Sequence, residues 1–254
     1  MSELIQMKIH YCWFGKQKKN SLIEACLQSW RDHLPEYEVF EWNEENTILD
    51  CDFALQAFKL KKWAFLSDYV RLKVLAEHGG IYLDTDMLFV RSLDEMLKYK
   101  CFIGYQANGQ IAAGIIGCLP HDPFIKYCLG KYKKLIFEED RLMNMAIPKV
   151  LTEAYHSYGN KSDVMIVSCE YFYPYLFEDS LKGLDYRMSL KEQTIAVHMW
   201  NASWFTEKEL AGFAFEHKKY LNGIKLLMIY FYRNPRYLIS LPFAALRFLL
   251  KNNK

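Results

Sequence analysis

One continuous run, residues 63–86, constrains the fold of this chain more than any other part of its sequence. Residues 63–78 contain no glycine or proline and repeat apolar side chains at helical spacing, which predicts an amphipathic helix. A glycine pair at 79–80 ends that helix. The apolar residues 81–83 follow as a central strand, which leads into a loop at two aspartates, Asp84 and Asp86. The chain opens with a strand over 8–14, a helix over 20–33 and a strand over 38–42, which is the order typical of an α/β domain.

The remaining pattern alternates short apolar runs with helical ones. Ser21 is expected to cap the helix over 20–33, with Glu24 completing a capping box. The glycines in residues 106–117 indicate either tight turns or a close approach to a bound ligand. We expect a further helical region over 123–156, broken at Pro148, and strands over 8–14, 38–42, 101–105, 111–119, 164–167 and 194–199. The predicted fold is α/β, with a mixed, mostly parallel central sheet flanked by helices.

The charge of the chain is unevenly distributed. Residues 215–254 carry a net charge of +7, whereas the other residues sum to −5. In the basic segment, lysines and arginines recur among bulky apolar residues, and its uncharged runs are far shorter than the roughly 20 residues that span a bilayer. We expect one domain over 1–214 and a helical, amphipathic tail over 215–254. The tail would lie on an anionic membrane surface or, alternatively, pack on the core.

The cysteines and the first residues indicate a cellular compartment. The seven cysteines are scattered without C-x-x-C spacing, which is typical of reduced thiols. The opening residues MSELIQMKIH lack the basic and then apolar pattern of a signal peptide. We therefore expect a cytoplasmic protein held peripherally at the inner face of the cell membrane, with no nucleic-acid partner.

The two aspartates are the strongest chemical signal in the sequence. In an extended segment, residues two apart project to the same side, so Asp84 and Asp86 can engage one divalent cation. Oxygen ligands favour hard ions such as Mg²⁺ or Mn²⁺. A solvated loop at the end of a strand is the alternative interpretation. Asp68 and Arg71 lie three apart on the preceding helix, where they form either a surface pair or a joint contact with a polar ligand.

The run SDYVRLKVLAEHGGIYLDTD at 67–86 resembles the DXD-containing segment of glycosyltransferases. The resemblance is to a glycosyltransferase family 32-like group that includes yeast mannosyltransferases, bacterial capsular polysaccharide glycosyltransferases and, distantly, the glucosylating clostridial toxins. Weaker pieces follow in the family's order: KIHYCWFG at 8–15, Ser29-Trp30, Pro35 to Tyr37, WNEEN at 42–46 and HMWNASW at 198–204.

This resemblance implies a GT-A fold that binds a nucleotide-sugar at the carboxyl ends of its strands and transfers the sugar with retention, using a metal ion. At matching positions, Trp13 would stack on the nucleobase and Asn46 would hold the nucleotide. Asp68 and Arg71 would contact the donor sugar. Asp84 would lie between ribose, sugar and metal.

The resemblance also implies a metal and diphosphate site at the end of the domain. Asp86 would be a direct metal ligand, and Ser203 or His198 would complete the coordination. Trp204 would donate a hydrogen bond to a phosphate oxygen. The sequence departs from the toxin pattern here, because the toxins have a glutamate where this chain has Trp200 or Asn201.

The expected activity is transfer of a hexose from a nucleotide-sugar, with Mn²⁺ or Mg²⁺, to a lipid-linked or oligosaccharide acceptor in capsular or surface polysaccharide synthesis. UDP is favoured over GDP by analogy with the bacterial members. The alternative is a non-catalytic, membrane-associated glycan-binding or scaffold subunit. A phosphatase of the haloacid dehalogenase kind is disfavoured, because Met87-Leu88 stand where that family needs threonine or valine.

Overall fold

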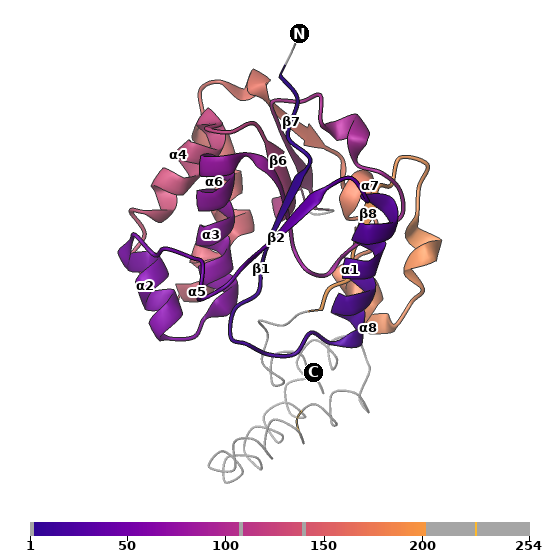
Figure 1. Ribbon diagram of the computed structural model, residues 1–254, viewed down its shortest axis with the longest axis horizontal. Helices are drawn as coiled ribbons and strands as arrows, with labels where there is room; N and C mark the ends of the chain where they lie inside the picture. The colour runs from indigo at the N-terminus through magenta and orange to yellow at the C-terminus, as the bar shows by residue number, and fades with distance from the viewer. Residues whose placement is uncertain (1–2, 107–108, 139–140, 202–226, 228–254) are drawn as a thin grey trace, which may run out of the picture. The chain divides into compact units, whose positions relative to one another are not determined.

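A six-stranded sheet forms the centre of the computed structural model, which describes residues 3–106, 109–138, 141–201 and 227 (Figure 1). The strand order is β2-β1-β3-β6-β5-β7. All neighbours run parallel except β6, which is antiparallel to both β3 and β5. The strands are β1 (Lys8–Cys12), β2 (Glu38–Trp42), β3 (Gly80–Leu83), β5 (Cys101–Tyr105), β6 (Ile111–Cys118) and β7 (Val164–Val167). The predicted α/β class with a mixed, mostly parallel sheet is confirmed.

A second, two-stranded sheet stands beside the first. Strand β4 (Met87–Phe89) pairs antiparallel with β8 (Ala196–His198), and Met87 lies opposite His198. This pairing joins segments more than one hundred residues apart in the sequence. It brings the end of the domain next to the two aspartates.

Helices cover both faces of the central sheet. Figure 1 shows α2 (Asp52–Lys59), α3 (Trp63–His78), α4 (Pro123–Tyr132) and α6 (Ile147–Ser157) on one face. Helix α1 (Ser21–His33) lies on the other face. Shorter elements are α5 (Leu142–Met145), α7 (Cys169–Phe172), α8 (Phe177–Lys182) and 3₁₀ turns at Asp94–Met96, Lys161–Asp163 and Tyr186–Ser189.

The central strand β3 is buried on both sides because its side chains alternate between the faces. Tyr82 belongs to the apolar cluster built with α3, α4 and α6. Ile81 and Leu83 belong to the opposite cluster, which contains Ile23 and Trp30 of α1. The two clusters hold the strand from both sides and thereby place its carboxyl end.

Four local expectations were wrong or incomplete. Asn20, not Ser21, caps α1, since its side-chain oxygen accepts a hydrogen bond from the Ile23 N–H at 3.0 Å. Pro148 stands in the first turn of α6, where a missing N–H is harmless, instead of breaking a longer helix. Gly114 lies inside β6 and not in a turn. Helix α2 was not predicted at all.

The described residues up to 180, together with residues 185–201, form one compact unit. The predicted boundary at 214/215 and the basic tail, apart from residue 227, lie outside the described residues. Among the helices that the structure describes, none is both long and apolar enough to cross a bilayer.

Candidate functional site

The backbone turn after β3 places the two aspartates at the carboxyl edge of the sheet. The Asp84 N–H donates to the Gly114 carbonyl at 2.8 Å, and the Asp84 carbonyl accepts from the Met87 N–H at 3.0 Å. This turn directs the chain from β3 into β4, with Asp86 between them. A Cβ on Gly114 would lie 3.2 Å from Asp84 Oδ2. The glycine therefore leaves room for the carboxylate.

His198 joins the two aspartates to form a cluster of three possible metal ligands. One ligand atom each of Asp84, Asp86 and His198 lies within 4.8 Å of the others. His198 Nε2 is 3.1 Å from Asp86 Oδ1. The other Asp86 oxygen accepts from the Asn201 N–H at 2.9 Å. The Met199 N–H donates to the Asp86 carbonyl, also at 2.9 Å. The segment after β8 therefore binds both the side chain and the backbone of Asp86.

The charges in this cluster support one another. Burial would raise the pKa of Asp86, but the imidazole of His198 and the Asn201 N–H lower it. For His198 the directions are reversed: burial alone would lower its pKa, but the Asp86 carboxylate raises it above its usual value. His198 Nδ1 is buried and has no hydrogen-bond partner among the described residues. Two carboxylates and an imidazole with a spare nitrogen form a donor set that suits a divalent cation, so the residues present fit a metal ion.

Arg71 is buried beside this cluster and binds several groups at once. Its Nη1 is 3.1 Å from Asp84 Oδ1 and donates to the Ala113 carbonyl at 2.7 Å. Its Nη2 donates to Asp68 Oδ1 at 2.9 Å, and its guanidinium lies 4.5 Å from the Tyr82 ring centroid. Burial would lower the pKa of Arg71, but Asp84, Tyr82 and Asp68 raise it well above its usual value. Arg71 therefore holds the Asp84 carboxylate in place.

Asp68 completes the buried group. Its Oδ2 accepts from the Ile147 N–H at 3.1 Å, at the start of α6. Burial raises the pKa of Asp68 to about 7, although Arg71 opposes this shift. Asp68 and Arg71 are 7% and 4% exposed, so the structure uses both to join α3, α6 and Asp84. Their contact with a donor sugar stays a prediction.

The residues predicted to hold the nucleotide lie at the ends of β1 and β2. Trp13 follows β1, its indole N–H donates to the Gln17 carbonyl at 2.8 Å, and the Lys19 ammonium lies 4.9 Å from its ring centroid. Asn46 uses its side chain within its own loop, accepting from the Asn43 N–H and donating to the Glu41 carbonyl. Nucleotide contact by either residue stays a prediction. Ser203 and Trp204 lie outside the described residues.

Three groups near the cluster were missed from the sequence. The Tyr173 hydroxyl accepts from the Ile115 N–H at 3.1 Å, and its ring packs 5.8 Å from that of His198. Trp200 adopts a φ of 54° and donates from its indole to the Tyr175 carbonyl at 2.8 Å. Asn201 contributes its backbone, and its side chain accepts from Asn20. For Trp200 and Asn201, the available signal was the motif HMWNASW at 198–204, but it did not indicate the backbone contact of Asn201 to Asp86. Tyr173 lies outside that motif.

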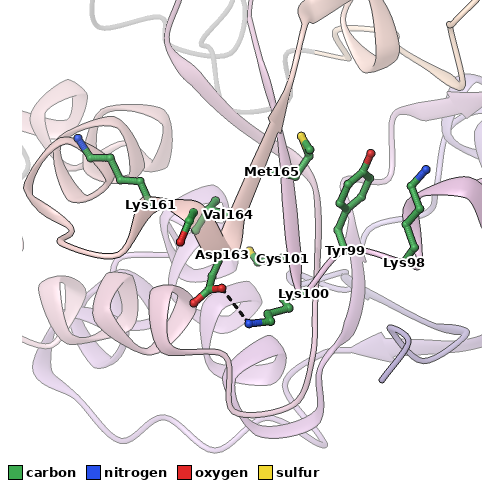
Figure 2. Close-up of a pocket in the computed structure, with 9 residues that line it drawn as sticks. Lys98, Tyr99, Lys100, Cys101, Lys161, Asp163, Val164 and Met165 are labelled. Atoms are coloured by element: carbon green, nitrogen blue, oxygen red, sulfur yellow. Dashed lines mark hydrogen bonds and ion pairs between the residues drawn. The ribbon is translucent and has the colours of Figure 1, made fainter. Parts of the chain in front are cut away.

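A separate pocket of about 340 Å³ lies at the amino ends of β5 and β7 (Figure 2). Since β3 runs in the same direction as β5, this is the sheet edge opposite Asp84. Lys100 forms an ion pair with Asp163 at 2.9 Å. The Lys98 and Lys161 side chains point away from that pair in Figure 2, so the lysines do not converge on one point.

Known proteins resemble this chain in sequence and in fold. A human alpha-1,4-N-acetylglucosaminyltransferase is 36% identical over 90 residues, which is 35% of this chain and 25% of that protein. Inositol phosphoceramide mannosyltransferase 3 of Schizosaccharomyces pombe is 27% identical over 130 residues, which is 49% of this chain and 34% of that protein. The chain therefore spans only about a quarter to a third of the length of these relatives.

A solved structure, "PaToxG Glycosyltransferase", shares the fold at a TM-score of 0.51 and 19% identity, covering 61% of this chain and 69% of that one. The family model for a glycosyltransferase sugar-binding region containing a DXD motif matches residues 21–103. That range contains α1, α3, β3 and both aspartates of the cluster. Residues 21–103 of this chain are thus similar to the DXD-containing sugar-binding region of glycosyltransferases.

Proposed function

We propose that this chain is a metal-dependent, retaining glycosyltransferase that moves a hexose from a nucleotide-sugar to a glycan acceptor. One observation carries the proposal. Asp84, Asp86 and His198 converge at the carboxyl edge of the sheet, where open α/β sheets bind their ligands. The three residues come from two distant parts of the chain, which is costly to arrange for a cluster of charges without a ligand.

Each residue of the cluster has a definable task. Asp84, Asp86 and His198 would hold Mn²⁺ or Mg²⁺, which supplies Lewis-acid stabilisation of the negative charge on the leaving diphosphate. Arg71 orients Asp84, since its Nη1 contacts Asp84 Oδ1, and Asp68 holds Arg71 in turn. Ser203 and Trp204 would bind the diphosphate, and Trp13 and Asn46 the nucleoside. We assign no covalent nucleophile, so retention would arise from attack on the same face as the departing diphosphate.

The donor, acceptor and location form the finer part of the proposal. We favour a UDP-sugar donor and a lipid-linked or oligosaccharide acceptor in capsular or surface polysaccharide synthesis. The name of the S. pombe relative includes a lipid, inositol phosphoceramide, which supports a lipid-linked acceptor. A peripheral position at the inner face of the membrane would bring the enzyme to that acceptor, with the +7 segment 215–254 on the anionic leaflet.

Nucleotide release tests the activity. The full-length protein with Mn²⁺ is incubated with a panel of UDP- and GDP-sugars, and the nucleoside diphosphate released is measured. Asp86→Asn should lower release by at least about 100-fold, because loss of several kcal/mol of charge stabilisation corresponds to that factor. Asp163→Asn, at the opposite sheet edge, is the matched control and should retain wild-type activity.

Two results would contradict the proposal. If the wild-type chain neither releases nucleotide from any donor nor binds one, the enzyme hypothesis is refuted, and the alternative of a non-catalytic glycan-binding scaffold takes its place. Full activity of Asp86→Asn would refute the assignment of Asp86 as a metal ligand but would leave the transferase activity standing.

Liposome flotation tests the membrane location. The full-length chain should float with liposomes that contain anionic lipid and should not float with neutral ones. Failure to float with either would refute the peripheral location.

A further inference from the structure

Two neighbouring side chains of α1, Ser29 and Trp30, bind the backbone of β4. The indole N–H of Trp30 donates to the Met87 carbonyl at 2.7 Å. The Ser29 hydroxyl accepts from the Phe89 N–H at 2.9 Å and donates to the Cys26 carbonyl at 2.6 Å. Both side chains are buried, so water cannot replace these bonds at low cost.

These contacts satisfy two backbone groups on the edge of β4 that pairs with no other strand among the described residues. β8 pairs with β4 on one edge. Alternate residues of a strand direct their N–H and C=O groups to the same edge, and Met87 and Phe89 are two apart. The Met87 carbonyl and the Phe89 N–H face α1, where Trp30 and Ser29 satisfy them. The two side chains thus take the place of a neighbouring strand.

The position of β4 determines the geometry of the metal ligands. β4 begins directly after Asp86, and its first residue, Met87, lies opposite His198. A shift of β4 would therefore move Asp86 and its contact to His198 Nε2 together. We propose that Ser29 and Trp30 are positioning residues that hold Asp86 and His198 at the spacing needed for a divalent cation. This inference rests on the metal site of the proposed function.

A binding assay with Mn²⁺ tests the positioning role. Electron paramagnetic resonance measures the Kd for Mn²⁺ on the full-length protein in the absence of donor. Ser29→Ala removes the hydroxyl, and Trp30→Phe removes the indole N–H but keeps an aromatic ring. Residues that orient metal ligands indirectly change affinity by about 10- to 100-fold. We expect the Kd for Mn²⁺ to rise by about tenfold in each variant. Ser29→Thr, which keeps the hydroxyl, should restore binding close to that of the wild type.

Thr152 offers a matched control. Its hydroxyl accepts from the Ile111 N–H at 3.0 Å and donates to the Pro148 carbonyl at 2.6 Å. Like Ser29, Thr152 is therefore a helix residue whose hydroxyl accepts from a strand N–H and donates to a carbonyl of its own helix. Thr152→Val and Ser29→Ala should both lower the Tm in EDTA by about 2 to 6 °C. Only Ser29→Ala should also weaken Mn²⁺ binding. A purely structural role would lower the Tm in both without this difference in Kd.

The outcomes separate the two hypotheses. If the wild type binds Mn²⁺ and the Kd is unchanged in Ser29→Ala and Trp30→Phe, the positioning role is refuted and the metal site stands. An equal loss of binding in Thr152→Val would also refute it, because the effect would then be general destabilisation. If the wild type binds no Mn²⁺, the metal site itself is refuted, and the positioning role with it.

Discussion

His10 should make the stability of this protein depend on pH between pH 7 and pH 4. It lies on β1 and is only 2% exposed. Its Nε2 is 3.1 Å from the Gly79 carbonyl, and its Nδ1 accepts from the Trp42 indole N–H at 3.2 Å. These partners assign the hydrogen to Nε2 and leave Nδ1 as an acceptor. A second proton on Nδ1 would face the indole N–H and abolish that bond.

The magnitude follows from the shift in the pKa of His10. The pKa of His10 is lowered from 6.5 to about 4, mainly by burial and also by the nearby charges of His78 and Lys8, while the hydrogen bond to the Gly79 carbonyl opposes the shift. Between these values the unfolded chain binds a proton that the folded chain does not. The free energy of unfolding therefore falls as the pH falls through this window. At about 1.4 kcal/mol per pH unit, the total loss is about 3 kcal/mol. Above pH 6.5 both states are neutral at His10 and the contribution is complete.

Urea unfolding followed by circular dichroism at several pH values measures this effect. The variant His10→Gln does not titrate, so carboxylates that protonate in both proteins cancel in the difference between them. Wild type should lose about 3 kcal/mol more than His10→Gln between pH 7 and pH 4. His156→Gln, at an exposed position on α6, is the control and should follow the wild type. A constant difference between wild type and His10→Gln across this range would refute a buried, neutral His10.

Three further predictions concern the site. Arg71→Lys keeps the charge but cannot bind Asp68 and Asp84 together, so it should lower the free energy of unfolding by about 2 to 4 kcal/mol. Urea unfolding measures this loss, and a loss below about 1 kcal/mol would contradict the buried network. Tyr173→Phe leaves the buried Ile115 N–H unpaired and should cost about 1 to 3 kcal/mol in the same assay, whereas an unchanged midpoint would show that this hydrogen bond contributes nothing. Mn²⁺ at about 100 times its Kd should raise the Tm of the wild type by about 5 to 10 °C, and Asp84→Asn should remove this rise; equal rises in both would exclude Asp84 as a ligand.

The sequence predicted best those elements whose signals are local. Helix α3 begins and ends at the predicted residues, because a long segment without glycine or proline is closed by Gly79, at a φ of 64°. The bounds of β2, β5 and β7 also match, and in β5 and β7 the signal is a short apolar run. Helix α2 escaped prediction because it has only eight residues, and its burial of Phe53, Ala54 and Ala57 depends on the rest of the core.

The choice of cap for α1 shows where local rules stop. Asn20 and Ser21 are both good capping residues, and the sequence pattern favoured the serine with its glutamate. The structure uses Asn20, whose carbonyl oxygen caps the helix while its amide group donates to Asn201 Oδ1 at 2.9 Å. The amide of Asn20 makes the two bonds with separate atoms, since its oxygen accepts and its nitrogen donates. The tertiary contact, 181 residues away, agrees with the selection of the asparagine.

The candidate site combines a local and a non-local part in the same way. Helical spacing predicted that Asp68 and Arg71 share a face, and they form an ion pair at 2.9 Å. Spacing could not show that the same guanidinium also reaches Asp84, because that contact depends on how α3 packs on β3. Arg71 therefore stands between two carboxylates, one of which is shared with the proposed metal ion. A cation bound at Asp84 would compete with Arg71 for its oxygens, so the affinity for metal reflects the packing of α3 as much as the aspartates themselves.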